Sequence, residues 1–159
     1  MILYLDSSAL IKHYIQESGS RSLTAKIQAE SRRQTGVFMS VAGYAEVLAV
    51  FARHLRENLL SRAEFDAVEN QFSDDWMFHL GRIELSAGVL GFIPELVRKH
   101  PLRGFDAIHL ASALWIRDAL RLGKSLAAGR PVTFATSDKQ LGRAAAAEGL
   151  DTFDPEDSV

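Results

Sequence analysis

The sequence predicts an α/β fold of three layers, in which a mainly parallel central sheet lies between two layers of helices. Short apolar runs rich in β-branched and aromatic residues alternate with segments of helical periodicity. Candidate helix caps follow several of these runs and the crossovers are short, as in repeated βα units whose strands pair in parallel. With 159 residues the chain has the size of one domain, so we expect residues 1–159 to fold as a single unit.

The first half of the chain contains two units of strand, cap and helix. The apolar run Ile2–Leu5 predicts a strand, and Ser7 or Ser8 can cap the helix that follows from Ala9 to about Gln16. Gly19 closes this unit. The other elements expected here are a helix at Leu23–Arg33, a strand at Val37–Met39, a cap at Ser40 and a helix from Val41 to about His54.

The middle of the chain is predicted to be mostly helical. Ser61 and Glu64 form a capping-box pattern that opens a helix. We expect a helix from Ser61 to about Phe72, a candidate strand at Met77–Leu80 and a helical segment at Leu85–Lys99. Pro94 removes a backbone donor inside the last segment, so a break is expected near Ile93.

The last third of the chain contains the longest predicted helix. It runs from Phe105 to Leu122, and its apolar stripe is expected to consist of Ile108, Ala111, Trp115 and Ala119. The remaining expected elements are a strand at Val132–Ala135, a cap at Ser137 and a helix from Lys139 to about Ala147 that ends at Gly149. The acidic tail after Phe153 is expected to fray.

The composition excludes several classes of protein. Hydrophobic residues make up 47% of the chain and charged residues 24%, which is typical of a globular domain and excludes disordered and fibrous chains. There is no cysteine, and the five histidines form no close ligand pair, so any metal must be held by oxygen. No window approaches the roughly 20 apolar residues that cross a bilayer, and Ile2–Leu5 is too short for a signal peptide. We therefore expect a cytoplasmic protein with no membrane partner.

Four carboxylates that lie far apart in the sequence are the candidate functional residues. Asp6 ends the first strand, Glu46 lies two turns into the helix after the second strand, Asp106 starts the long helix, and Asp138 follows the last long strand. Ligands of open α/β sheets bind outside the carboxyl ends of the strands, where these positions converge. Each acid also has a simpler explanation, as a helix cap or, for Glu46, as one solvated residue on an amphipathic helix.

Taken together, the four acids indicate a metal site. Two carboxylates about 4 Å apart repel by roughly 4 kcal/mol at an effective dielectric constant of 20, so a cluster needs protons or a divalent cation. Mg²⁺ and Mn²⁺ prefer oxygen ligands, and they support phosphodiester hydrolysis by a metal-activated water. The net charge of −2 argues only weakly against a nucleic-acid partner, because acids gathered around a metal leave the remaining surface more basic.

Four segments that carry these acids resemble the PIN-domain family, especially the VapC-type toxins of bacterial toxin–antitoxin pairs. They are YLDSSALIKHY at 4–14, SVAGYAEVLAV at 40–50, LRGFDAIHLASAL at 102–114 and TFATSDKQLGRAAAAEGL at 133–150. The resemblance implies a PIN-like sandwich in which Asp6, Glu46 and Asp106 are the core metal ligands and Asp138 is a fourth, more variable acid. The sequence departs from the family pattern at Pro94 and over residues 76–85.

The resemblance also implies supporting residues and partners. Ser7 and Thr136 are expected to hydrogen-bond around the site. The implied activity is that of an endoribonuclease that forms a homodimer and is silenced by a VapB-like antitoxin, whose inserted peptide carries an Arg toward the carboxylates. Arg103, beside Asp106, is the cation expected to contact RNA. Lys12 is among the other cations that could line an RNA path, although most such residues are ordinary solvated surface.

Some alternatives stay open. His109 lies three residues after Asp106 on the same helix face, where it can donate to the acids or to phosphate, or simply pack inside the fold. A phosphoryl-accepting Asp6 would need a second acid two residues on, where Ser8 stands. A stand-alone PIN nuclease in RNA processing and a catalytically silent binding module of the same fold are the other candidate functions.

Overall fold

The computed structural model describes residues 1–32, 36–122 and 129–157, and within them a five-stranded parallel sheet. The strand order is β3-β2-β1-β4-β5. The strands are β1 Ile2–Leu5, β2 Val37–Ser40, β3 Leu80–Ile83, β4 Val132–Ala135 and β5 Asp151–Phe153. Since every pair is parallel, the carboxyl ends of all the strands lie at one edge of the sheet.

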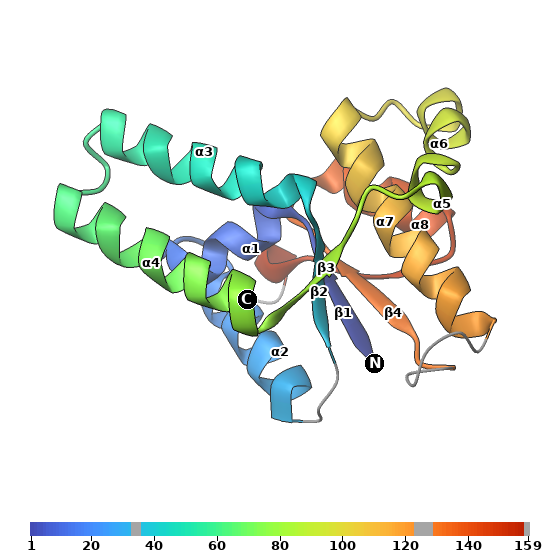
Figure 1. Cartoon of the computed structure of the whole chain (residues 1–159), viewed down its shortest axis with the longest axis horizontal. Helices are drawn as coiled ribbons and strands as arrows, with labels where there is room; N and C mark the ends of the chain where they lie inside the picture. The colour runs from blue at the N-terminus through green and yellow to red at the C-terminus, as the bar shows by residue number, and fades with distance from the viewer. Residues whose placement is uncertain (33–35, 123–128, 158–159) are drawn as a thin grey trace.

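Helices cover both faces of this sheet, which confirms the predicted three-layer fold (Figure 1). One layer contains α1 Ser7–Tyr14, α2 Ser20–Arg32, α3 Ala42–Arg56 and α4 Arg62–Phe78. The other contains α5 Ala87–Leu90, α6 Ile93–Lys99, α7 Gly104–Arg121 and α8 Lys139–Ala147. The central strand β1 shows why two layers form, because its alternate side chains enter different cores: Leu3 packs under the first layer and Tyr4 under the second.

Several predicted elements are confirmed by the structure. β1, β4 and α8 have the predicted bounds, and Ser61 and Glu64 form the predicted capping box of α4. The expected break near Ile93 separates α5 from α6, and Pro94 lies in the first turn of α6. The predicted end of the second helix, at Arg33, falls outside the described residues.

The predicted serine caps were wrong in three places. Asp6 caps α1 in place of Ser7 or Ser8, and Asp138 caps α8 in place of Ser137. A carboxylate is favoured there because its charge complements the positive end of the helix dipole as well as accepting from the backbone. Ser40 is the last residue of β2 and is buried, and the cap position of α3 is Val41.

The end of α4 and the third strand were also placed wrongly. α4 continues past Phe72 to Phe78, and the strand is Leu80–Ile83, so Met77 is helical. Phe72 and Trp76 both contact the ring of Tyr44 on α3, which extends the helical packing beyond the expected end.

Two further expectations are corrected by long-range contacts. Of the expected stripe only Ala111 is fully buried, while Trp115 is 37% exposed. The buried face of α7 also contains Ala107, Leu110 and Leu114. The tail does not fray up to Asp157, because residues 155–157 form a short 3-10 helix in which Glu156 binds Lys12 at 2.7 Å. Among the described residues, no helix has both the length and the apolar character required to cross a membrane.

Candidate active site

All four candidate carboxylates line one pocket at the carboxyl edge of the sheet. The pocket has a volume of about 460 Å³, and its lining includes Asp6, Glu46, Asp106, Asp138, Ser7 and His109. β1 and β4 pair in register up to Leu5 and Ala135, so the loops that follow both strands open side by side. The topology thus joins chain segments that are separated by more than a hundred residues.

Asp6 is the most deeply buried of the acids and is fixed on both of its oxygens. It is 4% exposed; its Oδ1 accepts from the Ala9 backbone N–H at 2.8 Å, and its Oδ2 accepts from the Thr136 hydroxyl at 2.6 Å. Ser8 donates to the same carboxylate. Burial raises the pKa of Asp6 above its ordinary value, although His109 and these hydrogen bonds act in the opposite direction.

Glu46 is held by two side chains from other elements. Its Oε2 accepts from the Ser7 hydroxyl at 2.7 Å and from His109 Nε2 at 2.7 Å. Burial alone would raise the pKa of Glu46, but the hydrogen bonds from His109 and Ser7 outweigh it and leave the pKa below its usual value. Glu46 is therefore kept as an anion.

His109 joins this pair to the interior of the fold. The Tyr4 hydroxyl lies 3.0 Å from His109 Nδ1 and accepts from the Ser40 backbone N–H at 3.1 Å. Tyr4 can therefore donate its own proton to Nδ1, which leaves Nε2 to donate to Glu46. His109 is both packed and connected to the acids, which combines the two alternatives left open by the sequence.

Asp106 and Asp138 lie at the starts of two helices. Asp106 Oδ2 accepts from the Arg103 backbone N–H at 3.1 Å, and Asp138 Oδ1 accepts from the N–H groups of Gln140 and Leu141 at 2.7 and 2.9 Å. Burial raises the pKa of Asp106, and the negative charges of Asp138 and Glu46 add to the shift. The carboxylates therefore repel one another in the absence of a cation.

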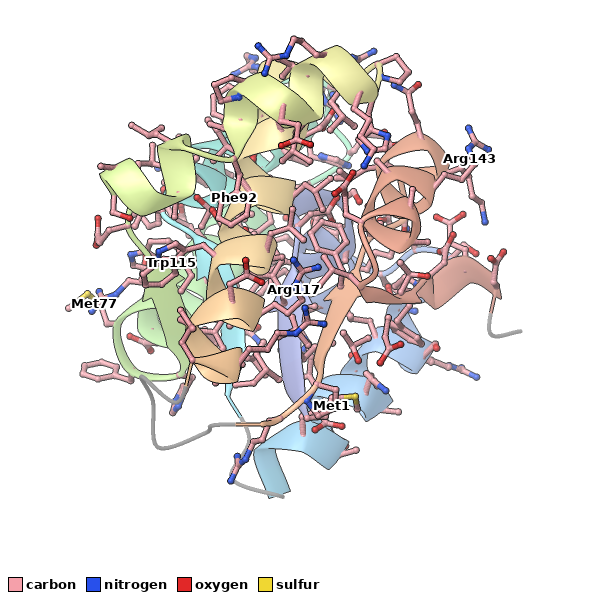
Figure 2. All side chains as sticks on the ribbon, turned by 90° about the vertical axis from the view of Figure 1, so that its right-hand side faces the viewer. Met1, Met77, Phe92, Trp115, Arg117 and Arg143 are labelled. Carbon is pink, nitrogen blue, oxygen red and sulfur yellow. The ribbon has the colours of Figure 1, made fainter. Side chains whose placement is uncertain are left out.

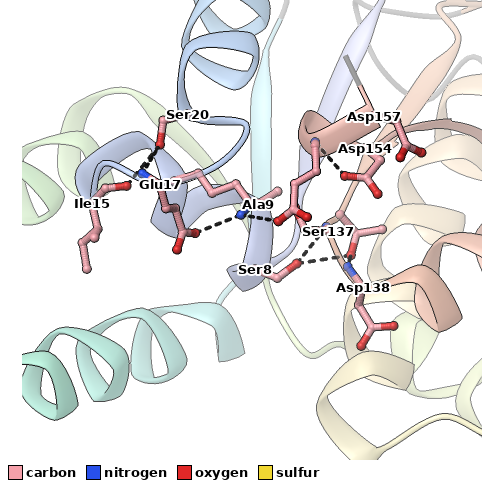
Figure 3. Close-up of polar contacts among 12 residues, drawn as sticks. Ser8, Ala9, Ile15, Glu17, Ser20, Ser137, Asp138, Asp154 and Asp157 are labelled. Carbon is pink, nitrogen blue, oxygen red and sulfur yellow. Dashed lines mark hydrogen bonds and ion pairs between the residues drawn. The ribbon is translucent and has the colours of Figure 1, made fainter. Parts of the chain in front are cut away.

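Two hydroxyls connect the loops on either side of Asp6. Thr136 Oγ1 donates to Asp6 and accepts from the Asp138 backbone N–H at 3.0 Å. Ser8 Oγ accepts from the Ser137 backbone N–H at 3.0 Å, and Figure 3 shows these residues meeting beside Asp138. The sequence identified Ser8 only as a cap; the Ser-Ser pair after the first strand was the available signal.

The cations around the pocket differ from those expected. Arg103 is exposed and does not line the pocket, whereas Lys12, Arg53 and His54 do. Lys12 is 5% exposed and binds Glu17 and Glu156 at 2.9 and 2.7 Å, so it is not ordinary solvated surface. Burial alone would lower the pKa of Lys12, but these two acids raise it.

The donor set suits a hard divalent cation. In the part of the chain that the structure describes, no three acidic or histidine side chains are arranged to hold a metal ion. The carboxylates would therefore have to rotate to coordinate one ion together. Glu46, Asp106 and Asp138 each use one carboxylate oxygen in the hydrogen bonds given above, and among the described residues the second oxygen has no partner. Carboxylate oxygens that can turn toward an ion, with water completing the shell, match what Mg²⁺ and Mn²⁺ require.

Comparisons with known proteins identify a family and relatives of this chain. A family model described as PIN domain matches residues 3–147. The ribonucleases VapC45 and VapC49 of Mycobacterium tuberculosis are each 34% identical over 117 residues, which cover 74% of this chain and 78% of the relative.

Among solved structures, VapBC2 from Rickettsia felis bound to a promoter DNA fragment matches with a TM-score of 0.67 at 12% identity, covering 97% of this chain and 98% of the other. FitAcB from Neisseria gonorrhoeae matches with a TM-score of 0.62 at 13% identity and the same coverage. These two structures share the fold of this chain.

Proposed function

Because the chain belongs to the PIN-domain family, we propose that it is a metal-dependent endoribonuclease and the toxin of a VapBC-type toxin–antitoxin pair, acting in the cytoplasm. Its relatives of 34% identity are named ribonucleases, which supports a nuclease. The observation that carries the metal-dependent mechanism is the convergence of Asp6, Glu46, Asp106 and Asp138 on one pocket.

The four acids are proposed to hold Mg²⁺ or Mn²⁺, directly or through water. When bound, the cation lowers the pKa of a water and offsets the charge on the phosphate. Asp6 supplies a fixed anchor because Thr136 and Ala9 hold its two oxygens. Ser7 and His109 keep Glu46 ionised and oriented, and Asp106 and Asp138 complete the acidic side of the pocket.

The structure gives little support to a phosphoryl-enzyme mechanism. Both oxygens of Asp6 already accept hydrogen bonds from inside the fold, and Ser8, in the place of the second acid, donates to Asp6. The second acid that such a mechanism needs two residues after the phosphorylated Asp is therefore missing. The stand-alone nuclease and the silent binding module remain the alternatives to the toxin.

Two protein partners belong to the proposal. The pocket is open and acidic, which suits an antitoxin peptide that brings an Arg to the carboxylates. A homodimer is supported by large apolar side chains left exposed near the edge strand β3, with Phe78 at 75% and Met77 at 59%. Figure 2 shows Met77 and Trp115 on the same side of the molecule.

The deciding experiment is cleavage of a fluorescent RNA by the purified chain. We expect cleavage with Mn²⁺ or Mg²⁺, none with EDTA, and a loss of at least about 100-fold in Asp6→Asn and Asp106→Asn, as for removal of one electrostatic stabiliser. Asn still caps a helix, so the Asp6→Asn variant should fold. The matched control is Asp74→Asn, at an exposed acid on α4.

Two results would contradict the mechanism: cleavage that survives EDTA, and full activity in both pocket variants. RNA binding without cleavage under either metal would instead favour the binding module. An antitoxin that abolishes the cleavage would separate the toxin from a stand-alone nuclease.

A further inference from the structure

One wall of the pocket is basic, although its floor is acidic. α3 carries Glu46 and, one turn later, Val50, and it continues to Arg53 and His54, all of which line the pocket. Residues seven and eight positions after Glu46 return to the same face of a helix. At 1.5 Å per residue, Arg53 lies about 10 Å from Glu46 along the helix axis.

Arg53 differs from the other cation of the pocket in having no acidic partner. Lys12 is neutralised by Glu17 and Glu156. Within residues 1–32, 36–122 and 129–157, no carboxylate lies within ion-pair distance of Arg53, and its side chain is exposed. An unpaired guanidinium directed to a pocket that contains four carboxylates is suited to an anion that extends from the acidic floor.

The neighbouring His54 presents a defined nitrogen. Its Nδ1 lies 2.9 Å from the Val50 carbonyl oxygen, which can only accept, so Nδ1 carries the proton. Nε2 is the nitrogen left for the pocket, where it donates to a phosphate oxygen only when the ring is in the doubly protonated imidazolium form. The hydrogen bond also holds the imidazole ring against α3, and His54 lines the same pocket as Arg53.

We propose that Arg53, assisted by His54, forms a phosphate-binding subsite that holds the RNA strand next to the phosphate that is cleaved. This inference rests on the proposed ribonuclease function. Carboxylates repel a polyanion, so the strand needs a cation where it leaves the metal site. The planar fork of an Arg matches two phosphate oxygens and is always charged. Its distance along α3 places it at a neighbouring nucleotide.

The test measures RNA affinity without cleavage. A fluorescein-labelled oligoribonucleotide is titrated with Asp106→Asn protein in Mg²⁺, alone or combined with Arg53→Gln, His54→Gln or Arg130→Gln. Arg130 is the matched control because it is exposed just before β4, at the opposite end of the sheet from the pocket. Anisotropy at several salt concentrations gives the dissociation constant and its salt dependence.

We expect Arg53→Gln to weaken binding about 5- to 20-fold and to reduce the slope of log K against log salt by about 0.7, the loss of one phosphate contact to a single strand. His54→Gln should weaken binding less, and Arg130→Gln should leave both quantities unchanged. In the otherwise wild-type chain, Arg53→Gln should raise KM with kcat within about twofold, since the contact is far from the reacting phosphate.

The proposal of a subsite is contradicted if Arg53→Gln changes RNA affinity no more than Arg130→Gln does. It is also contradicted if Arg53→Gln weakens only the binding of an antitoxin, because Arg53 would then be a protein contact. Thermal unfolding and Mn²⁺ affinity of Arg53→Gln should match the parent, which excludes a folding or metal-binding defect. The proposed function and the subsite can fail separately. If the chain cleaves no RNA but Arg53→Gln still weakens RNA binding, the subsite stands and the ribonuclease function fails. If the chain cleaves RNA but Arg53→Gln has no effect on binding, the ribonuclease function stands and the subsite fails.

Discussion

At the scale of single residues, Thr136 contacts two of the candidate metal ligands through one hydroxyl group. Its hydroxyl donates to Asp6 Oδ2 and accepts from the backbone N–H of Asp138, so one oxygen connects the loops after β1 and β4. The side chain is 3% exposed, so neither contact is replaced easily by water. The relative position of two proposed metal ligands therefore depends on a residue that does not line the pocket.

Thr136→Val should be costly although it preserves the side-chain volume. Removing the hydroxyl leaves the buried Asp6 Oδ2 with only the Ser8 hydroxyl as donor and takes the acceptor from the Asp138 backbone N–H. We expect a loss of about 1–3 kcal/mol in the free energy of unfolding. RNA cleavage should fall as well, because Asp6 and Asp138 lose their common contact. Urea unfolding and a cleavage assay test this, with Thr136→Ser as the control that keeps the hydroxyl. Equal stability and activity of all three proteins would contradict it.

At the scale of elements, the ends of the helices carry many of the ionic contacts. Glu148, directly after α8, accepts from Lys99 at the end of α6 at 2.8 Å and from His100 at 2.7 Å. These hydrogen bonds, with that of Lys99 the larger, hold the pKa of Glu148 below its usual value. The contact ties two helices of the same layer together through residues that do not line the acidic pocket.

The stabilisation by Glu148 should depend on pH in a definite direction. The folded-state pKa lies below the unfolded value, so the contribution is complete above the unfolded pKa, near 4.5, and is lost as the pH falls through the folded pKa. Glu148→Gln should cost about 1 kcal/mol at pH 7, given partial exposure, and less at pH 4. Urea unfolding at both pH values checks this against Glu57→Gln, an exposed control. A difference that grows on acidification would contradict it.

The elements also show how far the sequence alone could predict this fold. β1, β4 and α8 were correct because each is a short apolar run or periodic segment bounded by polar residues, a purely local signal. The end of α4 was wrong because Trp76 and Phe72 pack on Tyr44, a contact from another helix. The predicted stripe of α7 was correct at Ala111 and wrong at Trp115, because the neighbouring helices and the sheet bury a wider face of α7 than its own periodicity indicates.

The residues of the site also divide into those that local sequence signals predict and those that only the folded structure reveals. The acids were predicted at the carboxyl ends of strands, and the structure brings them to one pocket. Arg53 and His54 were not predicted, because on a solvent-facing helix a cation at the spacing of a candidate acid is indistinguishable from ordinary surface. Arg53 and His54 are distinguished from ordinary surface residues only by the structure, in which α3 lines the same pocket as Asp6 and Asp106.

At the scale of the whole molecule, one side is unusually apolar. Phe78 is 75% exposed at the end of α4, and the edge strand β3 follows it almost directly. An unpaired edge beside a large exposed ring is a feature that monomers usually avoid. The proposed homodimer would cover it.

Phe78→Asp should therefore shift the chain from dimer to monomer. Two charges brought together across a symmetric interface would repel, and the buried area of the ring would be lost. Light scattering after size-exclusion chromatography measures the mass, with Leu59→Asp as the control, since Leu59 is 63% exposed in the loop between α3 and α4. A wild-type monomer at micromolar concentration, or an unchanged mass in the variant, would count against a dimer through this side.

The pairing of β1 with β4 also determines when the acidic pocket can form during synthesis of the chain. Asp6 is synthesised before Thr136, which fixes one of its oxygens and lies 130 residues later in the chain. Until β4 has been made, the central strand lacks one neighbour and the pocket lacks the loop with Asp138. A chain translated only as far as β3 therefore cannot assemble the four acids, and Asp138 must be synthesised before this pocket can form.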